Sequence, residues 1–300
     1  MQRKPNIDMF GAISLIGFSV LLGFNQVVIK VVNGGLQPVF FAGLRSLGVI
    51  FCVWLWIRLR GRKLDFKPGT IGAGILMGVV FAFEFICLFM ALDLTSVTRT
   101  TVIFYSMPVW LAIAAHFLMP GERITPIKAA GLLMAFAGVS WAIISRGSGG
   151  EGSLTGDLFA LGAAFGWAGI TLVARATRLS EVRAEMQVFW QVLVSAPILL
   201  AVAPLFGPLV RDLEPVHLWG LGFQIVVVVS AGFIFWLRLL SIYPASSVAS
   251  FSFLTPIFGV FMGWLLLGET LSPSLILSLV LVAGGILLVN RPVRAPQAVP

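Results

Sequence analysis

The segment PGERITPIKAAGLLMAFAG at residues 120–138 is echoed by LGETLSPSLILSLVLVAGG at residues 267–285. Each copy carries a Gly-Glu turn, a proline four residues after the glutamate, and an apolar stretch that holds a glycine near its end. The two copies lie about half a chain apart. The sequence therefore predicts two related halves, at residues 1–146 and 152–300, with a short linker at residues 147–151.

The composition excludes a soluble fold. Apolar residues make up 59% of the 300 residues and charged residues 11%, whereas a typical soluble domain has about 45–50% and about 25%. These values indicate a polytopic membrane protein, and they exclude a disordered chain or a disulfide scaffold. Cys52 and Cys87 both lie inside apolar runs, so we expect small core residues there rather than a disulfide or a metal site.

Ten apolar runs are long enough to cross a hydrocarbon core of about 30 Å, which needs about 20 helical residues. None alternates with period two, and a lipid-embedded helix satisfies its own backbone, so each run is expected to be helical. Five is an odd number, so the second half enters the membrane from the opposite side. We expect an all-α polytopic membrane protein with ten transmembrane helices in two inverted five-helix repeats. The runs lie at about 10–32, 39–57, 71–92, 97–118, 127–144, 155–174, 186–206, 218–240, 245–267 and 274–290.

The net charge of +8 indicates orientation. When the N-terminus is taken as cytoplasmic, most Lys and Arg residues fall in cytoplasmic segments, which is the usual bias of membrane proteins. We therefore expect both termini to be cytoplasmic. No basic stripe lies on a soluble module, so we expect no nucleic-acid partner. The expected surroundings are a lipid bilayer, and we expect a monomer.

An inverted repeat offers two related faces whose roles can be exchanged, which is how many carriers reach both sides of a membrane in turn. The pattern thus favours a transporter of a small-molecule substrate. The alternative is a gene duplication in a static membrane protein. The sequence contains no P-loop, zinc signature or nucleophile elbow, so no catalytic residue, metal or cofactor is predicted, and the chain is not expected to be an enzyme.

Polar groups inside spans are the best site candidates, because a charge at a helix centre costs about 2.5–3.5 kcal/mol on insertion scales. Glu84 is the carboxylate near the middle of a span. It could bind a substrate amine or carry a proton, or it could form a structural ion pair with Arg45 or Arg99. Arg45 in turn could hold a substrate carboxylate. Arg99 opens its span, where snorkelling to the interface is an alternative.

Uncharged side chains in the spans extend this set, although hydrogen bonding between helices or simple packing is the alternative for each of them. Pro108 and Pro256 fall at equivalent mid-span positions, where each is expected to kink its helix. Aromatic rings near such kinks would suit a flat, amphipathic ligand. The uncharged candidates for substrate binding are Asn25, Tyr105, Trp167, Gln224 and Phe253.

Glu122 and Glu269, in the repeated turn, each precede a helix start, where a carboxylate meets unpaired amides and the positive end of the helix dipole. We expect them to cap these helices rather than to contact a substrate. Lys30 and Arg175 end the first and sixth runs, where a cation near the last carbonyls is favourable.

The duplicated Gly-Glu-x-x-(Thr/Ser)-Pro turn, the ten spans in two halves, and Lys30 and Arg175 at their positions give a chain that resembles the EamA family of the drug/metabolite transporter superfamily. The resemblance covers nearly the whole sequence. It implies movement of small metabolites, often outward, across the bacterial inner membrane, through a cavity built from helices one, three, four, six, eight and nine. More narrowly, the chain is similar to the aromatic amino acid exporters of that family.

The function expected from these observations is export of small amphipathic metabolites by alternating access, with aromatic or other apolar amino acids as the first choice. A carrier or exchanger of sugar-linked metabolites is the alternative within transport. Outside transport, the alternative is an intramembrane lipid-modifying enzyme. Its parts would be Glu84, Ser106 and His116, which form no recognisable arrangement in the sequence.

Overall fold

The computed structural model describes residues 7–119, 122, 124–145, 152–243, 251 and 253–290, without the side chains of Leu237, Leu240 and Ser241. The predicted linker at residues 147–151 and the start of the ninth span lie outside the described residues. Within the described ranges, eight helical stretches are long and apolar enough to cross a membrane, and two shorter apolar helices follow them. The predicted all-helical class is confirmed.

The first half contributes five spans, of which the fourth is made of two helices. They are α1 (Met9–Gly35), α2 (Pro38–Leu59), α3 (Ile71–Leu94), α4 (Val97–Phe104) with α5 (Met107–Leu118), and α6 (Pro126–Ile144).

In the second half, the third span is an α-helix, a π-helix and an α-helix in series. The spans are α7 (Leu154–Ala176), α8 (Ala184–Val202), α9 (Pro215–Phe223) with η3 (Gln224–Ala231) and α10 (Gly232–Ile242), α12 (Leu254–Leu267) and α13 (Pro273–Val289). Two short 3-10 helices, η1 (Arg178–Glu181) and η2 (Ala203–Phe206), follow α7 and α8.

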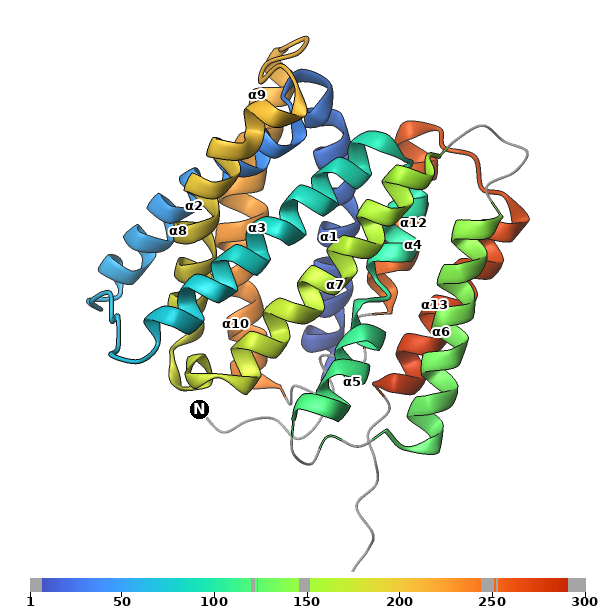
Figure 1. Cartoon of the computed structure of the whole chain (residues 1–300), viewed down its shortest axis with the longest axis horizontal. Coiled ribbons are helices and arrows are strands. Elements are labelled where there is room, and N and C mark those ends of the chain that lie inside the picture. Colours follow the sequence, from blue (N-terminus) through green and yellow to red (C-terminus); the bar gives the residue numbers. More distant parts are fainter. Residues whose placement is uncertain are drawn as a thin grey trace, which may run out of the picture.

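The two halves run in opposite directions. In Figure 1, α1 runs from the bottom of the bundle to the top, whereas α7, the first helix of the second half, runs from top to bottom. The packing partners follow the same rule: α1 packs on α12, as α7 packs on α4 and α5, while α2 packs on α8 and α6 on α13. This list stays the same when the halves are exchanged, as a two-fold relation between inverted repeats requires.

Hydroxyl side chains, not the repeated glutamates, cap the helices that follow the repeated turns. The side chain of Thr125 accepts from the backbone N–H of Lys128 at the start of α6, and Ser272 does the same for α13. Pro126 and Pro273 lie in the first turns, where a missing N–H costs little. The expectation that Glu122 and Glu269 cap these helices is wrong, because a Thr or Ser one residue before the helix reaches the amides directly.

The two prolines also differ from expectation. The fourth span is broken rather than kinked, since α4 ends at Phe104 and α5 begins at Met107, and this places Pro108 in the first turn of α5. Pro256 lies in the first turn of α12. Proline fits a first turn because its ring presets the backbone angle and its absent N–H would be unpaired there anyway.

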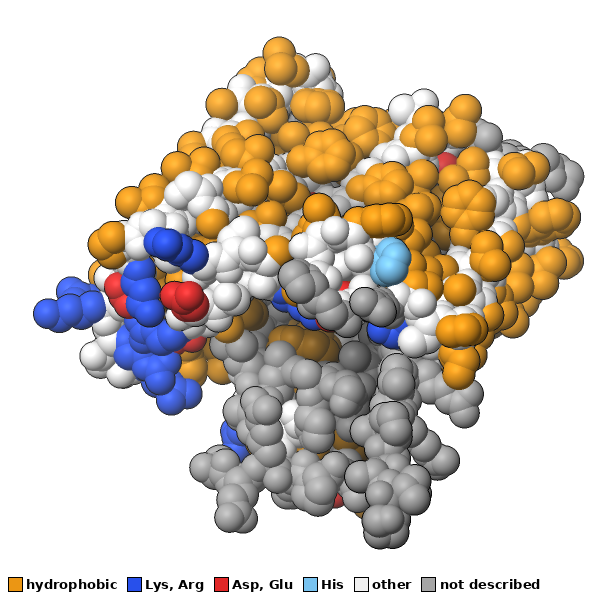
Figure 2. All heavy atoms as spheres, turned by 60° about the horizontal axis from the view of Figure 1, so that its bottom comes forward, with side chains coloured by type: hydrophobic (Ala, Val, Ile, Leu, Met, Phe, Trp, Pro, Cys, Tyr) orange, Lys and Arg blue, Asp and Glu red, His pale blue; other side chains and the backbone are white. Residues whose placement is uncertain are grey.

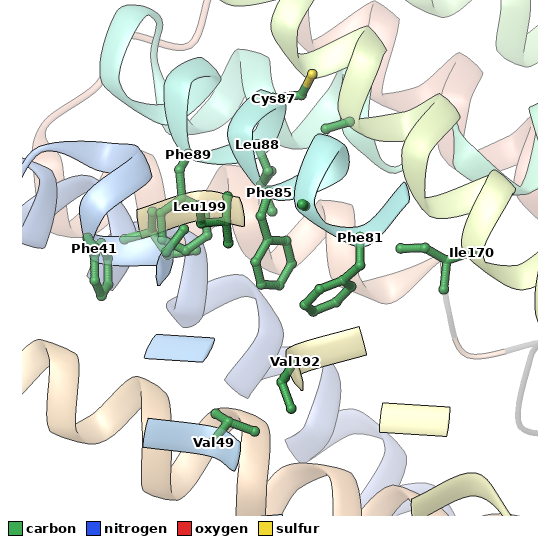
Figure 3. Packing of buried hydrophobic residues seen from close by; sticks show 14 of the residues in the cluster. Phe41, Val49, Phe81, Phe85, Cys87, Leu88, Phe89, Ile170, Val192 and Leu199 are labelled. Atoms are coloured by element: carbon green, nitrogen blue, oxygen red, sulfur yellow. The ribbon is translucent and has the colours of Figure 1, made fainter. Parts of the chain in front are cut away.

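The apolar core lies between the helices and a second apolar surface covers the outside. Phe41 and Val49 of α2, Phe85 and Phe89 of α3 and Leu199 of α8 pack together in the centre (Figure 3). Large apolar side chains also cover much of the upper part of the face seen in Figure 2, whereas most of the visible Lys and Arg side chains gather at its left edge. An apolar exterior with a charged end suits a helix bundle in lipid.

Candidate functional site

Four spans of the first half and one of the second bring buried polar side chains together inside the bundle. We name this group the central polar cluster. Its members are Asn25 and Gln26 of α1, Arg45 of α2, Glu84 of α3, Tyr105 at the break between α4 and α5, and Gln224 of η3, and each is less than 9% exposed. A cluster of this kind in an apolar bundle is by default a functional-site candidate.

Arg45 is held from two sides without a carboxylate. Its Nη1 donates to Oε1 of Gln224 at 2.9 Å. Its guanidinium carbon lies 4.0 Å from the ring centroid of Phe85 and 5.0 Å from that of Phe89, so the cation faces two aromatic rings. Arg45 and Glu84 interact electrostatically, but they form no ion pair within 4.0 Å among the described side chains. The structural pair expected as an alternative is not formed.

Glu84 is fully buried, and neither carboxylate oxygen has a hydrogen-bond donor among the described residues. Its Cβ faces α7 so closely that a methyl group at Gly166 would lie 2.6 Å from it. Glycine at this position therefore makes room for the glutamate. Because buried polar groups are almost always hydrogen-bonded, an unsatisfied carboxyl needs an explanation.

Gln224 links the second half to this site. It opens η3, a π-helix of eight residues. Its Oε1 accepts from Arg45, and its Nε2 donates to Oδ1 of Asn25. π-Helical turns are rare and are found mostly at functional sites. The sequence predicted Gln224 as a candidate but offered no sign of the π-helix.

Tyr105 is buried at the break in the fourth span, beside Gln26. It also lies within electrostatic range of Glu84. The hydroxyl of Thr101, one turn earlier, and Oε1 of Gln26 have no hydrogen-bond partner in the described part of the chain. Gln26 and Thr101 are not among the binding residues predicted from the sequence. Their polarity inside an apolar span was the signal that could have found them.

Three predicted residues lie outside the cluster. Arg99 instead forms a buried pair with Asp157: its Nη2 lies 2.6 Å from Oδ2, and its Nε donates to Oδ1 at 3.1 Å. Trp167 is 41% exposed and packs edge-on against Phe104. Phe253 packs on a separate apolar group near α12. Five of the eight predicted binding residues are thus brought together: Asn25, Arg45, Glu84, Tyr105 and Gln224.

The parts of a lipid-modifying site are not assembled. Ser106 is buried at the helix break, where its hydroxyl donates to the carbonyl of Ile103, whereas His116 lies near the end of α5 and contacts the backbone of Glu122 and Ile124 at the surface. Glu84 lies in the core. Candidate metal sites with three or more His, Cys, Asp or Glu side chains are also absent from the described residues.

Polar contacts join the helix ends at both faces of the bundle. At the upper end of Figure 1, Lys30 donates to the carbonyls of Asp93 and Thr95, which lie at the end of α3. The expectation that Lys30 caps its own helix is wrong, because α1 continues to Gly35 and the side chain reaches a neighbouring helix instead. Arg211 pairs with Asp93 at 2.7 Å, and this hydrogen bond raises the pKa of Arg211 above its ordinary value. At the lower end, Arg175 pairs with Glu122.

This chain is similar to several known proteins over most of its length. The chain is 23% identical over 278 residues to "Uncharacterized transporter YoaV" of Bacillus subtilis (strain 168), an alignment that covers 91% of this chain and 94% of that protein. It is 29% identical over 294 residues to "Probable amino-acid metabolite efflux pump" of Salmonella typhimurium, which covers 95% and 94%. The protein of that name from Escherichia coli is 27% identical over 295 residues, which covers 95% and 94%.

A solved crystal structure has the same fold, with a TM-score of 0.66 and 20% identity over 92% of this chain and 96% of that one. The profile of the EamA-like transporter family matches the chain twice, at residues 9–144 and 154–291. These two matches coincide with the two halves of the bundle, and the relatives are transporters by name. The chain is a multi-pass membrane transporter, and it belongs to the EamA-like transporter family.

Proposed function

We propose that this transporter exports small amphipathic metabolites, above all aromatic or other apolar amino acids, by alternating access, with the central polar cluster as its substrate site. The observation that carries the proposal is Glu84, a fully buried carboxyl whose oxygens have no donor among the described residues. A static bundle gains nothing from such a group. A carrier gains a charged partner for its solute.

Two further observations support the choice of solute. Two relatives carry the name of amino-acid metabolite efflux pumps. The cluster also combines a carboxyl, a guanidinium and the ring of Tyr105. The ring of Phe85 lies against the Arg45 guanidinium and that of Phe81 against Phe85, so the surroundings would suit a solute with charged and apolar parts. The site draws on both halves of the bundle through Gln224, as a carrier with a site at the repeat interface requires.

The test is counterflow in liposomes. The purified full chain is reconstituted, loaded with unlabelled amino acids, and assayed for uptake of the labelled forms with and without a pH gradient. We expect uptake of at least one apolar amino acid, and we expect Glu84→Gln to reduce it strongly. The matched control is Glu181→Gln, the same change at an exposed position in η1. Wild-type uptake by Glu84→Gln would contradict the assigned site, and uptake of nucleotide sugars alone would contradict the assigned solute.

We place the protein in a bacterial inner membrane with both termini cytoplasmic. The support is an exposed basic group in the last turn of α2 and in the loop to α3, at the lower end of the bundle where α1 also begins. Its members are Arg58, Arg60, Arg62, Lys63 and Lys67. A fluorescent protein fused to the C-terminus should fluoresce, whereas an alkaline phosphatase fused there should be inactive. The opposite pattern would reverse the orientation. Efflux of preloaded label from cells then tests export against import.

A further inference from the structure

The central polar cluster holds one buried acid and one buried base that do not pair with each other. We propose that Glu84 binds the ammonium group and Arg45 the carboxylate of a single zwitterionic α-amino acid that lies between them. This inference rests on the proposed function and adds which chemical group each side chain recognises.

Most hydrogen-bond donors of the Arg45 guanidinium have no acceptor among the described side chains. A guanidinium has five N–H donors and no acceptor. Among the described side chains, Oε1 of Gln224 is the acceptor within reach, and the rings of Phe85 and Phe89 occupy further space around the cation. Arg45 is only 4% exposed, so bulk solvent reaches little of its guanidinium. A carboxylate, which accepts from two guanidinium nitrogens at once, would satisfy them.

The second group is Glu84. It is 0% exposed, and it lies on α3, which packs against α2, the helix that carries Arg45. Neither of its oxygens has a hydrogen-bond partner among the residues described. An ammonium group offers three donors, which matches an acceptor-only carboxylate. Arg99, the other arginine that could have paired with it, is occupied by Asp157.

The ligand must meet both needs. An α-amino acid carries a carboxylate and an ammonium on one carbon, and its net charge is zero. It can therefore bring both charges into an apolar bundle together. A ligand that lacks either group leaves one buried charge unpaired, and sites that hydrogen-bond a substrate group reject analogues without it strongly. The rings near the cluster leave an apolar environment for the side chain.

The test removes the amino group or the carboxylate from the ligand, and the charge of Glu84 or of Arg45 from the protein. Binding to the purified full chain in nanodiscs is measured for the twenty standard amino acids. It is then measured for the tightest binder and its two analogues that lack the amino or the carboxylate group (for L-phenylalanine, 3-phenylpropionate and phenethylamine). We expect the wild type to bind the amino acid at least about tenfold more tightly than either analogue.

The variants should show opposite selectivity. Glu84→Gln should lose at least about tenfold in affinity for the amino acid and the amine, and keep its affinity for the carboxylate analogue. Arg45→Gln should show the converse. Glu181→Gln is the control, with wild-type affinities expected. Size-exclusion profiles and thermal unfolding show whether each variant is folded.

Each other result overturns a defined claim. Binding of no amino acid by the wild type contradicts the proposed function. Equal wild-type binding of the amino acid and of either analogue contradicts this inference alone, even if a variant does not fold. Folded variants that lose affinity for all three ligands equally, or that bind as the wild type does, also contradict the division of roles while leaving amino-acid transport in place.

Discussion

The two ends of the bundle carry the same repeated turn and use it differently. At the upper end, Glu269 is buried, and its two oxygens accept from the backbone N–H groups of Val97 at 2.6 Å and Thr98 at 2.8 Å. It thus caps α4, a helix of the other half. At the lower end, the equivalent Glu122 is 35% exposed and pairs with Arg175, which is 44% exposed. Equivalent residues therefore have unequal surroundings.

The unequal surroundings of Glu269 and Glu122 show that the inverted repeat is symmetric in sequence but not in this conformation. At the upper end, Glu269, Lys30 and the pair of Arg99 and Asp157 all make buried or partly buried contacts between helices. At the lower end, the pair of Arg175 and Glu122 is partly exposed to solvent. In the proposed carrier, the halves exchange roles between two conformations. The asymmetry seen here is what one such conformation, closed at the upper end, would have.

The largest expected effect comes from the upper end. Arg99→Met leaves the Asp157 carboxylate buried without its arginine, and breaking a buried pair in this way costs about 3–5 kcal/mol. We expect a loss of that size in the free energy of unfolding, measured by denaturant titration in detergent. A loss no larger than that of Arg175→Met at the lower end would erase the difference between the two ends.

Glu269→Gln should have the next largest effect. Hydrogen bonds to charged groups contribute about 1.5–3 kcal/mol. The substitution removes the charge and replaces one acceptor oxygen by an NH2 group, which cannot accept from a backbone N–H, so one of the two bonds is lost. The thermal unfolding temperature should fall, with little change for Glu122→Gln under the same conditions. Equal shifts for the two glutamates would show that burial of the turn does not matter.

The close approach of α1 to α12 allows the packing between the two halves to be tested directly. A methyl group at Gly23 would lie 2.8 Å from the backbone nitrogen of Gly259, and overpacking of this kind costs about 1–3 kcal/mol. Gly17, on the same helix, has nothing within 4 Å of such a methyl group. Gly17→Ala should therefore be neutral or stabilising by up to about 1 kcal/mol. Gly23→Ala should lower the unfolding temperature, and equal unfolding temperatures for Gly23→Ala and Gly17→Ala would contradict the close packing.

The smallest effect is expected at the lower end. Removing the exposed pair by Arg175→Met should change the free energy of unfolding by about 0–1 kcal/mol, since solvent and side-chain entropy offset its attraction. The effect should shrink further in about 1 M salt, where screening is strong. A loss above about 2 kcal/mol would mean that the pair is shielded in the membrane-embedded protein.

The sequence predicted the helices and the repeat well, and particular residues show why. Apolar runs and the Thr-Pro and Ser-Pro turns act within one segment, so Thr125 and Ser272 are where a local argument places a cap. Asp157 was missed because a carboxylate in the first turn of a span looks like a solvated helix start. Its role depends on Arg99, which lies far away in the sequence.

Hydrophobic transfer and backbone satisfaction are properties of each segment in lipid, so the class of protein, its apolar spans and the inversion of its halves could be predicted without a structure. Only the tertiary structure decided which polar groups meet. It paired Arg99 with Asp157, seated Glu269 on α4, and left Glu84 and Arg45 buried and apart. Such partnerships depend on distances between helices that are separate in the sequence, which no local pattern contains.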